Sequence, residues 1–264
     1  MAQTGAVIGR GSRFILHPVT ALRIAIVGAA VLIWEVVSAS GLLYRDVVPS
    51  LLTIGRAAAG LLMEPRFYGN LGVTGVEIIA ALAIGGGAGL LVGLVLGGSR
   101  FLARAYEPYL YYLGPTPKII FFPILIMWFG VGPASKVAMG AVSCFFPIAL
   151  SVAAGMRQID QVLIRVGRSF RARTWQMVTK VYLPAMRQPI VNGMRLGLGM
   201  AIIGTLLAET KLSNRGIGFM IINSYATFDM PRMYALLALL FIVAIGANAL
   251  IGRLSGHYAN NQPR

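Results

Sequence analysis

Ionisable side chains inside long apolar runs are the residues of this chain most able to do chemistry. Glu35, Glu77, Lys118, Arg195 and Glu209 lie within or at the edges of segments that are otherwise nearly uncharged. A charge in hydrocarbon is costly, so such residues usually face protein, water or a transported solute. We expect Glu35 to be a helix-packing or interfacial group and Glu77 to be solvated in the outer third of its segment.

Lys118, Arg195 and Glu209 are candidates for lining a solute path. Lys118 lies in "LGPTPKIIFFP", where prolines interrupt helical hydrogen bonding, and broken backbone at membrane depth is tolerated mainly beside protein or a water-filled path. Arg195 and Glu209 project from roughly the same face of one helix, about four turns apart. The two cations would make such a path favourable to anions. Alternatively, Arg195 extends its long side chain to the membrane edge.

Catalytic motifs are missing from the sequence. It contains no H-E-x-x-H, no G-x-S-x-G and no pair of carboxylates at a useful spacing. The single cysteine, Cys144, excludes a disulfide framework or a cysteine metal cluster. We expect no catalytic residue, no metal and no cofactor in this chain.

The composition predicts an all-α polytopic membrane protein. The chain is 57% hydrophobic and 12% charged, with a mean hydropathy of +0.76, which a soluble domain of this length does not need. Segment 49–63 is shorter and mixed, and predicts an amphipathic helix on the outer surface. Six membrane spans can be drawn, at about 23–43, 71–97, 108–128, 135–155, 189–210 and 233–253.

The positive charges predict the orientation in the membrane. With both termini in the cytoplasm, the inner segments hold about twice as many lysines and arginines as the outer ones. The net charge of +15 therefore indicates topology and contact with anionic lipid, and not nucleic acid. A cleaved signal peptide ending near Ser38–Ser40 is the alternative for the N-terminus, but the later spans need an uncleaved anchor. The predicted parts are a cytoplasmic segment 1–22, a first span with its external helix 23–70, a permeation core 71–253 with a cytoplasmic loop 156–188, and a cytoplasmic tail 254–264.

Two local patterns predict contacts within and beyond the core. Gly85, Gly89, Gly93 and Gly97 recur every four residues and form a stripe on one helix face, which allows a neighbouring helix to approach closely. The basic, amphipathic stretch 156–184 lies between apolar segments and is long enough for two short helices joined by a turn. Such a segment predicts a docking surface for a cytoplasmic partner.

Four pieces of the sequence resemble the permease subunits of binding-protein-dependent bacterial ABC importers, and more narrowly the nitrate, sulfonate and taurine branch. They read "VGRSFRARTWQMVTKVYLPAMRQPIVNGMRLGLGMAIIGTLLAET", "PTPKIIFFPILIMWFGVGPASK", "FFPIALSVAAGMRQID" and "RGIGFMIINS". Together they cover most of the chain beyond residue 70. The resemblance implies a type I importer permease core that couples to its ATPase through the cytoplasmic loop.

The chain departs from the cytoplasmic signature of that family, which is E-A-A, three residues, Gly, nine residues, then I-x-L-P. Leu183 and Pro184 match its end, whereas Arg171 stands at the glycine and Arg165 begins the E-A-A position. Either the turn is shifted toward Gly167 or Thr174, with Arg171 in ordinary geometry, or this subunit pairs with a second permease that keeps the standard signature. We expect the first. The residues that the resemblance assigns to ATPase coupling are Arg165, Gly167, Arg168, Ser169, Phe170, Arg171, Ala172, Leu183 and Pro184.

The resemblance also implies a transport function and a set of partners. The chain would form half of the translocation path for a small solute, expected to be an anion, in the bacterial inner membrane. Its implied partners are cytoplasmic ATP-binding subunits that carry the ATP, a second permease subunit (the same chain or a different one), an external solute-binding protein and membrane lipid. The alternative is a secondary transporter or channel without an ATPase, and a membrane enzyme is a distant third. A secondary transporter predicts internal symmetry between halves, which this sequence does not show.

Overall fold

The computed structural model describes residues 18–41 and 47–259, with side chains as far as Arg253, and these residues form helices, turns and loops without a strand. The chain divides after Thr53 into two compact units. In the first unit, α1 (Pro18–Ser40) is followed by a short return segment. Glu35 Oε1 accepts a hydrogen bond from the backbone N–H of Leu51 at 2.7 Å, and Trp34 Nε1 donates to the carbonyl of Pro49 at 3.1 Å. Glu35 therefore has the helix-packing role that the sequence predicts.

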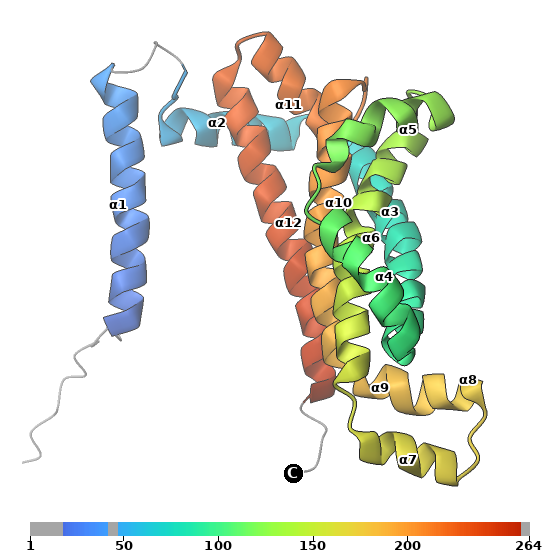
Figure 1. Cartoon of the computed structure of the whole chain (residues 1–264). Coiled ribbons are helices and arrows are strands. Elements are labelled where there is room, and N and C mark those ends of the chain that lie inside the picture. The colour runs from blue at the N-terminus through green and yellow to red at the C-terminus, as the bar shows by residue number, and fades with distance from the viewer. Residues whose placement is uncertain (1–17, 42–46, 260–264) are drawn as a thin grey trace, which may run out of the picture. The chain divides into compact units, whose positions relative to one another are not determined.

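The second unit is a helical bundle with a hairpin at one end (Figure 1). Its elements in chain order are α2 (Leu51–Met63, which begins in the first unit), α3 (Pro65–Gly98), α4 (Arg100–Leu113), η1 (Lys118–Phe121), α5 (Phe122–Phe129), α6 (Pro133–Arg157), α7 (Gln161–Ser169), α8 (Thr174–Met177), η2 (Val178–Tyr182), α9 (Leu183–Ala185), α10 (Arg187–Lys211), α11 (Ile217–Ala226) and α12 (Met230–Ala259).

Five described helices are long and apolar enough to cross a membrane: α1, α3, α6, α10 and α12. The predicted third span, 108–128, is not one continuous helix. The chain breaks after Leu113 and bends by 91° between α4 and the η1–α5 segment, so the count reaches six only if this bent pair is one span. Pro115 and Pro117 explain the break, because each lacks an N–H donor and disfavours helical geometry in the residue before it.

The predicted amphipathic helix at 49–63 is confirmed as α2, but its apolar residues divide between two faces. Leu61 is buried and Ile54 packs beside it, in a cluster that includes Phe67 of α3 and Leu236 of α12. Leu52 and Met63 are exposed, the latter at 85%. Part of α2 therefore belongs to the core of the second unit.

The glycine stripe of α3 makes the close helix contact that the sequence predicts, and its partner is α6. A Cβ atom added to Gly93 would lie 2.6 Å from the Cβ of Val152 and 2.7 Å from the carbonyl oxygen of Ala149. Gly85, Gly89 and Gly97 face the same helix with similarly little space. Because only hydrogen fits between these backbones, the stripe sets how closely the two helices can approach.

Gly93→Ala should therefore lower the stability of the protein in detergent by about 1–3 kcal/mol, since the added methyl meets backbone that cannot move aside alone. Thermal unfolding of the purified chain measures the effect. Gly87→Ala is the matched control on the same helix, because nothing lies within 4 Å of its added Cβ. Equal unfolding temperatures for the two variants would contradict close α3–α6 packing.

Candidate functional site

The loop 156–188 folds into a hairpin of short helices, α7 to α9, at the opposite end of the bundle from α5 and α11 (Figure 1). Asp160 begins α7 by accepting a hydrogen bond from the N–H of Val162 at 2.8 Å. Gly167 lies where the two arms of the hairpin meet, and a Cβ there would lie 2.5 Å from the sulfur of Met177. Buried Ile159 and Met186 join both ends of the hairpin to the core cluster around Ile148. The two-helix prediction for this segment is confirmed.

Arg171 adopts the left-handed conformation, with φ of +50°, so the expected shift of the turn away from this residue is wrong. The N–H of Ala172 donates to the carbonyl of Gly167 at 3.1 Å, and the N–H of Arg171 donates to the carbonyl of Arg168 at 2.9 Å. This pair of bonds is the Schellman motif that ends many helices, whose left-handed position is usually glycine. Because the motif satisfies the last carbonyls of α7, the turn keeps its geometry although arginine adopts it at a cost.

The exposed surface of the hairpin combines aromatic and cationic side chains. Phe170 is 83% exposed and Trp175 is 75% exposed, at the end where α7 turns into α8. Arg165, Arg168, Ser169, Arg171 and Pro184 are also exposed, while Ala172 and Leu183 are half-buried. Large exposed aromatics beside arginines are the composition typical of the centre of a protein interface.

A buried polar cluster lies away from the hairpin, between α3, α6 and α10. It contains Thr74, Glu77, Lys136 and Glu209, each at most 3% exposed. The expectation that Glu77 is solvated is therefore wrong, because its side chain is buried. Lys136 Nζ donates to the carbonyls of Val131 and Gly132 at the start of α6. One Glu77 oxygen has no hydrogen-bond partner among the described residues.

Glu209 holds the beginning of α11 through this cluster. Its two carboxylate oxygens accept hydrogen bonds from Thr74 Oγ1 at 2.7 Å and from the N–H of Gly218 at 2.6 Å. Thr74 Oγ1 in turn accepts from the N–H of Ile217 at 2.8 Å. The first N–H groups of a helix lack partners within the helix and favour negative charge. Glu209 thus serves as a cap for α11 supplied by a different helix.

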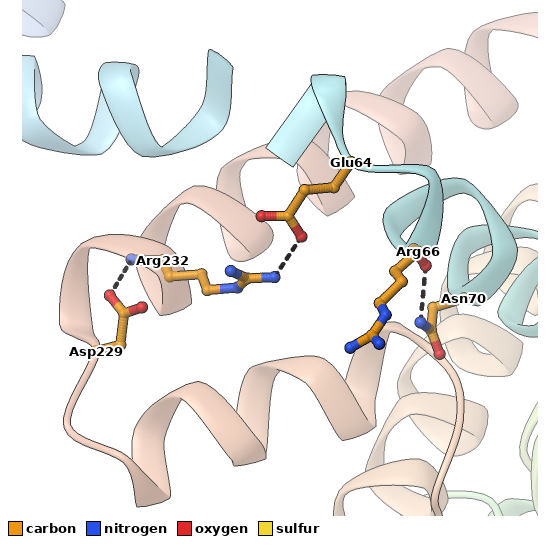
Figure 2. A network of polar contacts seen from close by, with 5 residues as sticks. All are labelled: Glu64, Arg66, Asn70, Asp229 and Arg232. Atoms are coloured by element: carbon orange, nitrogen blue, oxygen red, sulfur yellow. Dashed lines mark hydrogen bonds and ion pairs between the residues drawn. The ribbon is translucent and has the colours of Figure 1, made fainter. Parts of the chain in front are cut away.

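A second polar network lies beside the start of α3 (Figure 2). Asn70 donates to the carbonyl of Arg66 at 2.8 Å and accepts from the N–H of Gly216 at 2.7 Å. Arg232 forms an ion pair with Glu64 at 2.6 Å, and its own N–H donates to Asp229 at 3.2 Å. A pocket of about 330 Å³ opens between these residues and α11. The network fixes the turn between α11 and α12 against α3.

The three residues predicted for a solute path have separate surroundings. Lys118 is buried, and its ammonium group donates to the carbonyls of Gly114 and Thr116 and lies 5.1 Å from the centre of the Phe146 ring. Arg195 is exposed, with its guanidinium against Gly252 near the end of α12. Glu209 caps α11. Within the described residues, Lys118 therefore stabilises the broken backbone around Pro115, while the exposed side chain of Arg195 lies beside α12.

The sequence did contain a signal for the residues of the buried cluster. Asn70, Thr74 and Glu77 recur at i, i+4 and i+7, which places three polar side chains on one face of an otherwise apolar helix. Taken singly, each residue is unremarkable in a membrane segment. Their common face predicts a polar contact with another helix, and the structure supplies Glu209 as that contact.

Arg171→Gly should leave the stability of the protein unchanged or raise it by up to about 1 kcal/mol. Relief of the left-handed strain, roughly 1–2 kcal/mol, outweighs the entropy that glycine adds to the unfolded chain, about 0.5–1 kcal/mol. Arg173→Gly is the matched control, since Arg173 has an ordinary φ of −66° and gains no relief. Thermal unfolding compares the two, and a larger loss for Arg171→Gly than for Arg173→Gly would exclude the left-handed turn.

Glu209→Ala should destabilise the protein by about 3 kcal/mol or more, because it leaves the buried N–H of Gly218 and the hydroxyl of Thr74 without an acceptor, at about 1–3 kcal/mol each. Hydrogen exchange at Ile217 and Gly218 should accelerate. Glu64→Ala removes a partly exposed ion pair and should cost less, about 1 kcal/mol. Unchanged exchange at the start of α11 would disprove the capping role.

Comparison with known proteins assigns the chain to a family. The model of the family "Binding-protein-dependent transport system inner membrane component" matches residues 85–259. The chain is similar to the taurine transport system permease protein of Escherichia coli (strain K12), at 30% identity over 80% of this chain and 78% of that one. It is also similar to the nitrate import permease protein of Synechococcus elongatus, at 28% identity over 84% and 85%.

A solved structure has the same fold. It is an inward-facing structure of the MetNI methionine ABC transporter, which matches with a TM-score of 0.59 and 21% identity, covering 81% of this chain and 98% of that one. The helical core with its hairpin and the family match indicate the same kind of protein. The chain therefore belongs to the family of inner-membrane components of binding-protein-dependent transport systems, in which it is a multi-pass permease subunit of an ABC importer.

Proposed function

We propose that this permease imports a small organic or inorganic anion of the nitrate, sulfonate and taurine class. The similarity to taurine and nitrate permeases supports the solute class. An external solute-binding protein delivers the anion, and this chain and a second permease subunit form the path together. The exposed Arg195 on α10 offers the path a cation, whereas Lys118 is occupied by backbone carbonyls.

The energy comes from cytoplasmic ATP-binding subunits, a proposal that the family match and the fold shared with an ABC transporter support. Both termini and the hairpin α7–α9 face the cytoplasm in this proposal, as the distribution of lysine and arginine favours. Closure of the ATPase pair moves the hairpins and shifts the permeases between inward- and outward-open states. Such a shift requires the ATPase to bind the two states with different free energies.

The observation that carries the proposal is the exposed aromatic end of the hairpin. Phe170 and Trp175 project from a segment whose two ends are anchored in the core by Ile159 and Met186. A docking surface needs both properties, since a rigid connection to the core transmits movement and large exposed aromatics supply binding energy. Arg171 and Arg173 lie beside them and supply contacts for acidic groups of the partner.

Trp175→Ala should reduce co-purification of the ATPase subunits by at least about tenfold, because buried interface tryptophans commonly contribute 2 kcal/mol or more. The full importer is expressed with the variant permease, and the yield of ATPase per permease is measured. Trp128→Ala is the matched control: Trp128 is 74% exposed, against 75% for Trp175, but lies on α5 at the other end of the bundle. Equal ATPase yields from the two variants would refute docking through the hairpin.

A further inference from the structure

A basic groove of about 930 Å³ lies between the hairpin and the core. Its walls come from the turn between α3 and α4, the first turns of α4, the end of α6, α7 and Tyr182 of η2. Met156, Ile164 and Tyr182 belong to the same apolar cluster, so the groove crosses the junction at which the hairpin is anchored. Whatever occupies it contacts the core and the hairpin at once.

The groove carries an excess of positive charge. Arg100, Arg104, Arg157 and Arg168 line it, and Glu107 is its one acidic lining residue. Glu107 is already paired with Arg157. Arg100, Arg104 and Arg168 form no ion pair with any other residue in the described part of the chain, although they come from two elements that face each other. Guanidinium groups in this arrangement match the oxygens of a phosphate.

We propose that this groove binds the phosphate headgroup of an anionic phospholipid from the cytoplasmic leaflet. The volume is far larger than one free phosphate needs, and it is sufficient for a headgroup with its glycerol. The wall formed by α4 continues into exposed apolar and aromatic side chains, among them Phe101 at 78% and Tyr112 at 79%, beside which acyl chains can lie. Basic pockets between membrane helices on the cytoplasmic side have the chemistry that anionic headgroups require.

The bound headgroup has a consequence for coupling. It joins Arg100 and Arg104 of the core to Arg168 of the hairpin, so it restrains α7 against α4. Anionic lipid therefore becomes a condition for efficient transmission of movement between the ATPase and the permeation core. This inference rests on the proposed cytoplasmic position of the hairpin.

The test uses the full chain in nanodiscs of phosphatidylcholine, with or without phosphatidylglycerol. Native mass spectrometry should show phosphatidylglycerol retained on the wild type in preference to phosphatidylcholine. The preference should fall by about fivefold for each groove arginine replaced by glutamine, and hydrogen exchange in α7 should become independent of phosphatidylglycerol. The groove variant combines Arg100→Gln, Arg104→Gln and Arg168→Gln. The control variant removes equal charge from exposed hairpin positions outside the groove, with Arg165→Gln, Arg173→Gln and Lys180→Gln.

A lysine version of the groove variant keeps the charge and should retain part of the preference, which separates headgroup binding from misfolding. Equal retention of phosphatidylglycerol by the groove variant and the control variant would overturn the proposal. Protection of α7 by inorganic phosphate alone, in phosphatidylcholine discs, would show that the ligand is a soluble phosphate and overturn the lipid assignment. ATPase co-purification is measured on the wild type in parallel. If the ATPase does not co-purify, the proposed function is contradicted. If the ATPase does co-purify but the wild type shows no preference for phosphatidylglycerol, only the groove proposal is contradicted.

Discussion

The close approach of α3 and α6 is the constraint on which the rest of this structure depends. In a membrane, apolar helices gain little by leaving lipid for one another, so association relies on dense packing and on polar contacts. Glycines at every fourth residue of α3 permit that density against Ala141, Ala149 and Val152. The same two helices carry Glu77 and Lys136 into the interior. Their spacing therefore decides both the packing of the core and the geometry of its charged cluster.

The polar cluster explains how a short helix is held at the end of this core. Glu209 and Thr74 satisfy the first N–H groups of α11 from two other helices. The hairpin at the opposite end is fixed differently, through apolar contacts of Ile159 and Met186 and through a Schellman turn at Arg171. The two ends of the subunit thus rely on different interactions, polar capping at one and apolar anchoring at the other.

Much of this architecture could be predicted from the sequence, because long apolar runs, a four-residue glycine repeat and a basic loop each have one simple physical interpretation. The five long apolar helices, a close helix contact at the glycine stripe and the two-helix hairpin follow directly. Pro115 and Pro117 indicated that the helix is interrupted after Leu113, but the sequence pattern does not predict that the chain bends there by 91°. The left-handed Arg171 could not be predicted from residue preference, because the hydrogen bonds of the whole turn outweigh that preference. The burial of Glu77 depended on contacts between residues distant in sequence, 74 and 209 among them, which local patterns do not show.

The capping of α11 by earlier helices has a consequence for how the chain is made. Synthesis delivers α3, with Asn70 and Thr74, to the membrane before α10 and α11 exist. Until Glu209 and the N–H groups of Gly216 and Ile217 arrive, these two polar side chains lack their final partners in an apolar environment. A chain that ends before α10 therefore leaves both side chains without these partners. Insertion of α10 and α11 thus completes polar contacts whose first members are already present in α3.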